Sequence, residues 1–524
     1  MPKADAAGAP SVHTEIELKL AIAPQDLGRL AKAPWLKAMQ SGRARTRSLN
    51  ATYFDTPDNH FQRHGLHFRI RKEDGRFVQT VKAKGASGGS AFGRREWALP
   101  VAQGSPDTGP LGADDVLGRL MPAAGALKAV FETRVQRTTR RLKPASGGEI
   151  SWDLDVGEIV TEAGSSPLHE LELELVSGDP SQLFRVARQV LNVVPARLIR
   201  QSKADRGYAL VVGAGPTYHK ARPHRWDADA TTERVLAAVV TGCLDQLVAN
   251  EDCVLQRAHI EGVHQMRVAL RRLRAVFDLH RDLIPAAQHA ALAGHVKRIN
   301  AVLGPARDWD VMVHEVIRPV IAAEREADGA ELARLNQAAT AARERAYGAV
   351  RALLHSAAYG AAVLDLGAWV ESREWRRPAT GTAAAGLASP ARTLAAEALA
   401  KRHRWLAKRG SRLADLAPAA RHRVRLAVKK QRYAAEILGS LFGPRAAKRY
   451  TTRLVALQDV LGHLNDVAMA RGRLAELVAG AESDTGLAYG AGLVIGWHEH
   501  NRILREAALR ATWNRFAKAD PFWT

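Results

Sequence analysis

The sequence HQMRVALRRLR occupies residues 264–274, and HRVRLAVKKQR at residues 422–432 repeats its basic positions with a constant offset of 158 residues. The repeated side chains define two sets. The first basic row is His264, Arg267, Arg271 and Arg274, and the second basic row is His422, Arg425, Lys429 and Arg432. Steps of three, four and three residues put each row on one face of a helix. The chain is therefore predicted to contain a duplicated helical unit.

The same offset continues beyond the basic rows without an insertion. Leu303-Gly304 matches Leu461-Gly462, and Asp308 matches Asp466. Because each aspartate follows a Leu-Gly break, helix capping or pairing with the basic row is favoured over catalysis. Within each row, like charges one helical turn apart repel one another. A repetitive anionic partner would compensate for that repulsion.

The charge of the whole chain supports an anionic partner. The formal net charge is +22 and the sequence pI about 10.3, as expected for a protein that meets nucleic acid, an acidic membrane or polyphosphate. Residues 1–218 contain 30 Lys+Arg against 23 Asp+Glu, whereas the rest contains 46 against 31. Aromatic residues are only 6% of the chain, which argues against single-stranded nucleic acid bound by base stacking. No DNA- or RNA-reading motif is evident either.

The cellular compartment is predicted from cysteines and apolar segments. The two cysteines, Cys243 and Cys253, lie ten apart in a helical stretch and are expected to be buried small hydrophobes in a reducing compartment. No apolar h-region follows Met1, and no apolar run approaches the ~18 residues of a membrane span. We therefore expect neither secretion nor membrane spanning, and a protein of the cytoplasm or of polyphosphate granules within it.

The pattern of the chain changes near residue 215. Before it, short alternating segments bounded by Gly, Pro and Asn/Asp turns are typical of an antiparallel sheet or barrel. After it, long Ala/Leu/Arg/Glu stretches with a 3.6-residue period predict helices. The predicted fold class is α+β. The expected parts are a β domain at 13–212, a linker at 213–230, and an all-α domain at 231–510 with halves at 231–375 and 391–510. The first twelve residues are expected to be disordered.

Charged residues alternate with aliphatic ones along the predicted strands. In residues 15–20, EIELKL, the charges share one face and the aliphatic residues the other. The same alternation recurs at His67, Arg69 and Arg71; at Thr80, Lys82 and Lys84; at Arg94 and Glu96; at Glu132, Arg134, Gln136, Thr138 and Arg140; at Asp153 and Asp155; and at Glu170, Glu172 and Glu174.

Two structures fit this alternation. One is a half-buried sheet whose polar face is merely hydrated. The other is a closed antiparallel barrel with a charged lumen, in which carboxylates hold a divalent metal and Arg and Lys hold phosphate oxygens. Same-sign runs such as Glu170, Glu172 and Glu174 are unfavourable without a cation or counter-charges. This favours the charged lumen.

Several motifs occur in a fixed order in this region: Glu15, Glu17 and Lys19 in an ExExK strand, YFDTP at 53–57, Arg69 and Arg71 with Lys82 after them, ELELE at 170–174, and Ser202-Lys203. In this order, residues 13–210 resemble the CYTH superfamily of triphosphate tunnel enzymes. The resemblance implies an eight-stranded closed tunnel that hydrolyses triphosphate-like substrates with Mg²⁺ or Mn²⁺.

The resemblance also implies roles for individual residues. Metal ligands would come from Glu15, Glu17, Glu170, Glu172 and Glu174. Phosphate ligands would be Lys19, Arg69, Arg71, Lys82, Arg134 and Lys203. The carboxylate that orients the attacking water stays open between Glu96 and Asp153, and His67 is expected to have a structural or supporting role. These assignments suit phosphoryl transfer, which depends mostly on positioning and charge neutralisation, and Arg binds phosphate through a rigid fork.

The helical half resembles a second family. The two basic rows, together with the Leu-Gly-x-x-x-Asp segments that end at Asp308 and Asp466, resemble the CHAD domain over roughly residues 230–510. The resemblance implies two four-helix bundles related by a pseudo-two-fold axis, with a basic groove that binds inorganic polyphosphate. His264 and His422 could bind a metal, contact phosphate or be core histidines. A phosphate contact is favoured, because their neighbours are cationic and no Cys or second His lies at i+3 or i+4.

We therefore expect a metal-dependent hydrolase of inorganic tripolyphosphate or short polyphosphate, joined to a polyphosphate-binding module. The alternatives are a polyphosphate-binding or granule-associated scaffold without activity, a tunnel enzyme acting on thiamine triphosphate or ATP, and a nucleic-acid binder supported by charge alone.

Overall fold

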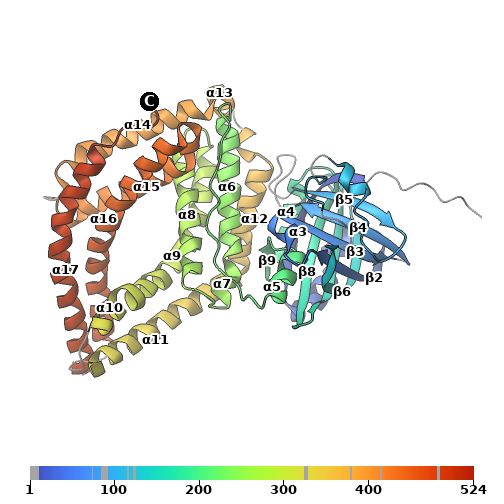
Figure 1. The fold of residues 1–524 in the computed structure, drawn as a ribbon, viewed down its shortest axis with the longest axis horizontal. Helices are drawn as coiled ribbons and strands as arrows, with labels where there is room; N and C mark the ends of the chain where they lie inside the picture. Colours follow the sequence, from blue (N-terminus) through green and yellow to red (C-terminus); the bar gives the residue numbers. More distant parts are fainter. Residues whose placement is uncertain are drawn as a thin grey trace, which may run out of the picture. The chain divides into compact units, whose positions relative to one another are not determined.

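The computed structural model describes residues 11–73, 75–83, 93–114, 117–121, 126–323, 329–377, 381–413, 416–480 and 484–524. Residues 1–10, for which disorder is expected, lie outside this description, whereas Ser11 and Val12 already belong to a strand. The chain divides into two compact units (Figure 1). The first comprises Met1–Tyr218, Glu251–His259 and Leu354–Glu374. The second comprises His219–Asn250, Ile260–Leu353 and Trp375–Thr524.

The first unit is built around an antiparallel sheet. Its strands are β1 (Ser11–Ile22), β2 (Gln40–Asp55), β3 (Leu66–Glu73), β4 (Arg76–Ala83), β5 (Gly93–Val101), β6 (Lys128–Leu142), β7 (Glu149–Thr161), β8 (Gly164–Ser177) and β9 (Ala196–Ile199). Their order is β5-β4-β3-β2-β6-β7-β8-β1-β9.

Strand β1 links the two ends of this order. Residues 11–16 pair with β5, and residues 17–21 pair with β8. Each neighbour thus holds about half of β1. The predicted tunnel is therefore a sheet whose two edge regions, β5 and β8, are joined only through β1. It is not a barrel in which neighbouring strands pair along their whole length.

The two faces of the sheet differ in chemistry. Leu18, Leu20, Leu171 and Leu173 are fully buried on the outer face, where α4 (Ser181–Leu191) packs against β1 and β8. The remaining short elements between the strands are η1 (Pro24–Asp26), α1 (Leu27–Ala31), α2 (Pro34–Met39), α3 (His60–Arg63) and η2 (Pro110–Ala113). Phe61 of α3 and Leu111 of η2 belong to one buried cluster with Phe68 and Trp97 of the sheet. The opposite, inner face carries the alternating charges. The period of two in these strands therefore separates an apolar core from a charged interior.

Helix α5 (Lys203–Val211) packs on the inner face. Its Ala204 and Tyr208 form a buried cluster with Tyr53 and Phe131. Two short elements of the helical part of the chain also belong to the first unit: α7 (Glu251–Leu255) and α12 (Ala357–Glu371). Helix α12 packs against α4 and β9. The first unit thus extends beyond the predicted domain boundary at residue 212.

The second unit contains the duplicated helices. The first half has α6 (Thr232–Ala249), α8 (Glu261–Leu279), α9 (Ala286–Val311), the π-helix η4 (Met312–Ile317), α10 (Arg318–Ala323) and α11 (Gly329–Leu354). After η5 (Glu374–Arg376) and α13 (Thr382–Ala388), the second half has α14 (Ala391–Gly410), α15 (Pro418–Leu438), η7 (Gly439–Leu441), α16 (Pro444–Ala479) and α17 (Thr485–Ala517). Part of the predicted break at 378–390 lies outside the described residues.

The helices confirm the duplication. Adding 158 to the first residue of α6, α8, α9 or α11 gives the start of α14, α15, α16 or α17 to within two residues. The segments that precede α6 and α14 also pair with each other: the Thr232 amide donates to the Ser389 carbonyl at 2.9 Å, and the Ala391 amide to the Ala230 carbonyl at 2.8 Å. This reciprocal pairing is typical of an approximate two-fold relation. The α+β prediction with two related helical halves is confirmed.

The two helical halves meet where α10, α11, α16 and α17 end close together, at the lower left of Figure 1. There, Trp309, Ile317, Leu335, Leu474 and Val494 belong to one buried cluster. None of the described helices is long and apolar enough to cross a membrane by itself. By length and composition alone, α11 and α12 together would be, but they are bent by 59° to each other.

Candidate functional site

Strands β1 and β8 bring most of the predicted charged residues together on the inner face. Lys19 is directly opposite Glu172, and Glu17 is directly opposite Glu174. The Lys19 Nζ donates to Glu17 Oε2 at 2.8 Å and also contacts Glu172. Lys203, the first residue of α5, reaches the same place. Its Nζ lies 2.7 Å from Asp155 Oδ2 and 2.9 Å from Glu172 Oε1.

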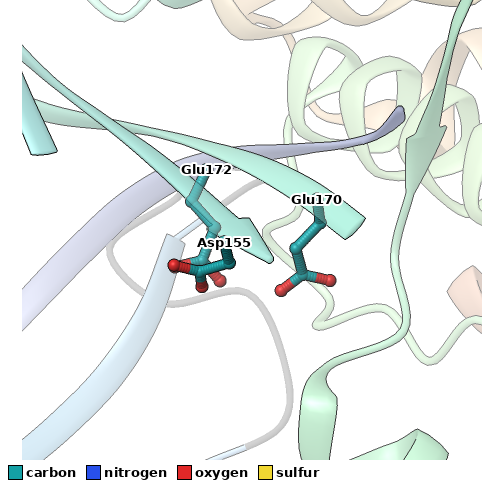
Figure 2. Close-up of side chains that lie close together, drawn as sticks. All are labelled: Asp155, Glu170 and Glu172. Atoms are coloured by element: carbon teal, nitrogen blue, oxygen red, sulfur yellow. The ribbon is translucent and has the colours of Figure 1, made fainter. Parts of the chain in front are cut away.

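One carboxylate cluster consists of Asp155, Glu170 and Glu172, which Figure 2 shows side by side on β7 and β8. One oxygen from each lies within 4.8 Å of the others. Burial alone would raise the pKa of Glu172, but Lys19 and Lys203 help to hold that pKa well below its usual range. The cluster is therefore already matched by protein cations, which also include Arg137 and Arg206.

Glu174 lies two residues after Glu172 on β8, near Glu15 and Glu17, whose carboxylates are paired with Lys82 and Lys19. Burial raises the pKa of Glu174 to about 7, and the carboxylates of Glu15, Asp153 and Glu17 act in the same direction against Lys82. Like charges directly opposite each other on paired strands destabilise a sheet. Carboxylate oxygens are the ligands that Mg²⁺ and similar hard cations use in proteins. Carboxylates at this point of the sheet have the chemistry to hold a divalent cation, as has the cluster of Asp155, Glu170 and Glu172.

The predicted metal ligands thus separate into two groups. Glu15, Glu17, Glu170 and Glu172 are each paired with a lysine, whereas burial and nearby carboxylates raise the pKa of Glu174. Asp155, which the sequence places on the charged face without a role, completes the cluster with Glu170 and Glu172. No sequence signal distinguishes the groups, because every member alternates on its strand in the same way.

The cations of β3 and β4 line the adjoining part of the inner face. Lys82 Nζ lies 2.6 Å from Glu15 and 2.7 Å from a Glu96 oxygen. Burial would lower the pKa of Lys82, but Glu15 and Glu17 raise it above its usual value. Burial would likewise raise the pKa of Glu96, but Lys82 and Arg69 lower it. Lys82 and Glu96 are therefore both held in their charged forms.

Two arginines from β3 complete this region. The Nε of Arg69 is buried and makes no hydrogen bond within the described part of the chain, and Arg71 follows on the same face of the strand. His67 is buried beside them, with its Nε2 3.7 Å from Asp205 Oδ1. The two guanidinium groups share one face of β3, and no described residue accepts a hydrogen bond from the Nε of Arg69. They suit an anionic ligand with several oxygens.

The prediction for Arg134 is wrong about its face. Arg134 is 55% exposed and contacts Glu132 outside the sheet, whereas Arg137 lies on the inner face. Arg137 donates from Nε to Asp155 Oδ1 at 2.7 Å and from Nη2 to Oδ2 at 2.6 Å. It also lies 3.3 Å from Asp153 Oδ2 and contacts Glu172. A shift of one residue reverses the face of every side chain on a strand, and β6 carries arginine on both faces.

Two other motif residues are structural. The buried Asp55 of the YFDTP motif accepts hydrogen bonds from the amides of Phe61 and Gln62 and from the Tyr208 hydroxyl at 2.7 Å. Asp55 thus anchors α3 and α5. Ser202 caps α5, because its side chain accepts from the Asp205 amide while the Asp205 carboxylate accepts from the Ser202 amide. This reciprocal cap fixes the start of α5, where Lys203 enters the site.

The basic rows lie on α8 and α15 of the second unit, and these two helices contact each other. His264, Arg267 and Arg271 are half-buried, and Arg274 is exposed. In the second row His422 is exposed and the other three residues are half-buried. The Nε atoms of Arg267, Arg271 and Arg432 are buried and make no hydrogen bond within the described residues. Because Arg432 Nε also lies 3.5 Å from Glu436 Oε1, the Nε donors of Arg267 and Arg271 are the ones within the described residues that an anion could take up.

The surroundings of the first basic row explain its electrostatics. Burial lowers the pKa of His264 to about 4, and Arg307, Arg271 and Arg267 act in the same direction. His264 is therefore neutral in the free protein near pH 7. Arg307 carries no sequence signal beyond its place next to Asp308 in the chain. Asp308 lies inside α9, and its side chain is 3.6 Å from Arg473, which belongs to neither basic row. The Asp466 side chain lies outside the described residues.

The comparisons with known proteins agree with this geometry. The CYTH domain model matches residues 13–208, and the CHAD domain model matches residues 238–475. An inorganic triphosphatase from Haemophilus influenzae is 30% identical over 200 residues, which is 37% of this chain. This chain thus spans 54% of the length of that protein.

Solved structures also resemble the two parts. The CHAD domain from the plant Ricinus communis is 28% identical, with a TM-score of 0.49 over 57% of this chain and 97% of that one. A Hippeastrum protein, described as an adenylyl cyclase candidate with a dominant triphosphatase activity, is 18% identical. Its TM-score is 0.29 over 38% of this chain and 96% of that one. This protein consists of a CYTH domain at residues 13–208 followed by a CHAD domain at residues 238–475.

Proposed function

We propose that this protein is a metal-dependent hydrolase of inorganic tripolyphosphate or short polyphosphate, and that its CHAD domain binds longer polyphosphate. The observation that carries the proposal is the inner face of the sheet. It combines the carboxylates of Glu15, Glu17 and Glu174 with buried cations on neighbouring strands. A chain of phosphates with a bound divalent cation is complementary to both groups. The triphosphatase activity named for the Haemophilus influenzae relative supports the same reaction class.

The chemistry would divide between the two groups. Glu15, Glu17 and Glu174 would hold Mg²⁺ or Mn²⁺, which neutralises phosphate charge and polarises the phosphoryl group when bound. Lys19, Lys203 and Lys82, with Arg69, Arg71 and Arg137, would bind phosphate oxygens. Positioning and charge neutralisation of this kind supply most of the catalysis in phosphoryl transfer.

Asp153 is the better candidate to orient and deprotonate the attacking water. Burial raises the pKa of Asp153 and outweighs the opposing effect of Arg137, whereas the pKa of Glu96 is lowered. A carboxylate with a raised pKa accepts a proton more readily at neutral pH. Asp153 is also held in place, because it accepts a hydrogen bond from the Thr139 hydroxyl at 2.5 Å.

The two basic rows would bind polyphosphate through their cationic side chains, among them the Nε donors of Arg267 and Arg271. A linear polyanion with repeating charges matches two repeated rows of cations. As binding releases counterions, affinity should fall steeply with salt concentration. Binding of phosphate beside His264 would also favour its imidazolium form, since a nearby anion raises a histidine pKa. We also propose that the protein acts in the cytoplasm, where polyphosphate would be its substrate and ligand.

The test is a substrate panel of pyrophosphate, tripolyphosphate, long-chain polyphosphate, ATP and thiamine triphosphate, each with Mg²⁺ and with Mn²⁺. Wild type should hydrolyse tripolyphosphate best and lose activity reversibly in EDTA. Glu17→Gln should be folded and inactive. Glu132→Gln, which changes a carboxylate outside the sheet, is the matched control and should retain activity. Hydrolysis that persists in EDTA would remove the metal mechanism. A preference for ATP or thiamine triphosphate would instead assign another substrate to the same site.

A further inference from the structure

The edge strand β9 connects the two lysines of the site. It pairs with β1, where Ile199 lies opposite Lys19 and Arg197 lies opposite Ala21. The chain then passes from β9 through the cap residue Ser202 into α5, which begins with Lys203. The position of β9 therefore affects both Lys19 and Lys203.

β9 is held by residues from outside the CYTH match at 13–208. Arg197 donates from Nη1 to Glu251 Oε2 at 2.9 Å and from Nη2 to Asp252 Oδ1 at 3.1 Å, both in α7. Tyr359 of α12 donates to the other Glu251 oxygen at 2.6 Å. Glu251 is 2% exposed. Both of its oxygens are thus used inside the first unit.

Helix α12 is shaped to approach this strand closely. A Cβ on Gly360 would lie 2.9 Å from the Ala196 carbonyl oxygen and 3.1 Å from a methyl group of Leu191. Contacts at these distances would force α12 away from β9, so glycine permits the approach. Tyr359, next to Gly360 in the chain, reaches Glu251 from this position. The close packing and the polar contacts therefore belong to one interface.

The polar contacts at Glu251 are better suited to fixing geometry than to adding stability. Burial raises the pKa of Glu251 to about 7, against the effect of Arg197 and Tyr359. Burial of an ion pair costs desolvation energy that the pairing largely offsets, so such pairs add little net stability. Their hydrogen bonds nevertheless have strict directions, and Arg is held in a planar fork.

We infer that Arg197, Glu251 and Tyr359 are positioning residues for the CYTH site, because they fix β9 and so align Lys19 and Lys203 with the bound phosphates. The inference rests on the proposed triphosphatase function. It means that the catalytic unit is incomplete at residue 208 and requires α7 and α12 from the helical part of the chain. Since α7 is joined in the chain to α6 and α8, the CHAD region supplies part of the support of the active site.

The test uses the full-length protein with Glu251→Gln and, separately, Tyr359→Phe, which removes a single hydroxyl and should leave the fold intact. Misplacement of catalytic groups lowers the rate of the bound complex. We therefore expect kcat for tripolyphosphate to fall about tenfold or more, with a smaller change in KM. The matched control is Asp365→Asn, also on α12, whose contact with Arg188 at 3.7 Å is exposed. This control should keep the wild-type kcat.

A second measurement does not depend on turnover. Hydrogen exchange of the amides at 202–206 should become faster in Glu251→Gln than in Asp365→Asn, because α5 loses a fixed start. If Glu251→Gln and Tyr359→Phe both keep the wild-type kcat well below their Tm, the positioning role is overturned. A lower Tm would not rescue it, because a fall in Tm alone shows only that these residues contribute to packing. If wild type hydrolyses none of the panel, the proposed function fails. The exchange measurement then still decides whether Glu251 orders Lys203, and unchanged exchange would overturn that too.

Discussion

Arg137 and Arg134 are a matched pair that tests the inner face of the sheet. Both are arginines of β6, three residues apart, but they leave the strand on opposite faces. Arg137 contacts three acidic side chains inside and is 19% exposed, whereas Arg134 is 55% exposed and contacts Glu132. We predict that Arg137→Ala destroys activity and that Arg134→Ala does not.

The expected magnitudes follow from burial and partners. Removing one partner of a buried ion pair costs ~3–5 kcal/mol, because the other charge stays buried. Lys203 and Lys19 still reach Asp155 and Glu172, so a loss near the lower limit, about 3 kcal/mol of unfolding free energy, is expected for Arg137→Ala. Loss of one preorganised cationic donor lowers kcat by roughly 100- to 1000-fold. For the exposed Arg134, the change in stability should stay within about 0.5 kcal/mol.

The assay is kcat/KM for tripolyphosphate with saturating metal, together with urea unfolding monitored by circular dichroism. Arg137→Lys guards against a variant that fails to fold. It keeps the positive charge but loses the two-pronged contact with Asp155, so it should be stable and still impaired. The assignment of the faces of β6 would be refuted if Arg137→Lys and Arg137→Ala were both active and Arg134→Ala were inactive.

Two further predictions concern metal and polyphosphate. Because the pKa of Glu174 is raised to about 7, protons should compete with Mn²⁺ and metal affinity should fall as pH decreases through 7; calorimetry should show that Glu174→Gln loses this step. Without metal, the raised pKa means that Glu174 contributes to the unfolding free energy below about pH 4.5 and that this contribution is lost as pH rises past 7. Denaturation of wild type and of Glu174→Gln at several pH values can measure the difference. In the CHAD domain, Arg271→Ala and Lys429→Ala should each weaken binding of long polyphosphate and reduce the salt slope by about 0.7–0.9. Neutralising either complete row should cripple binding comparably in a salt series, and retention of affinity after loss of one row would mean that the rows do not share a ligand.

Much of the architecture is encoded in local sequence. The 158-residue offset and the steps of three and four predict two related sets of helices, and α8 and α15 carry the rows as expected. Helical periodicity is a local property, so no knowledge of distant contacts is needed. The alternation in EIELKL and ELELE likewise predicts the charged face of β1 and β8, because a strand places successive side chains on opposite faces.

Local alternation could not decide which face of β6 is inside. Residues 132–140 include arginine on both faces, and the pairing of Arg137 with Asp155 across β6 and β7 selects the inner one. Nor could alternation show that burial raises the pKa of Glu174 against Lys82 alone, while three cations lower the pKa of Glu172. That difference depends on Lys19, Lys203 and Arg137, which come from three separate elements.

The extent of the first compact unit is also a tertiary property. By sequence, α7 and α12 are ordinary helical segments of the CHAD region, and nothing near Glu251 indicates a partner far along the chain. Folding places Glu251 against Arg197 and Gly360 against Ala196. The sequence by itself thus determines the repeats, the helices and the alternating strands, because these depend on neighbours a few residues apart. The tertiary structure decides which charges meet and which segments support the site, because electrostatic compensation and close packing depend on distance in space.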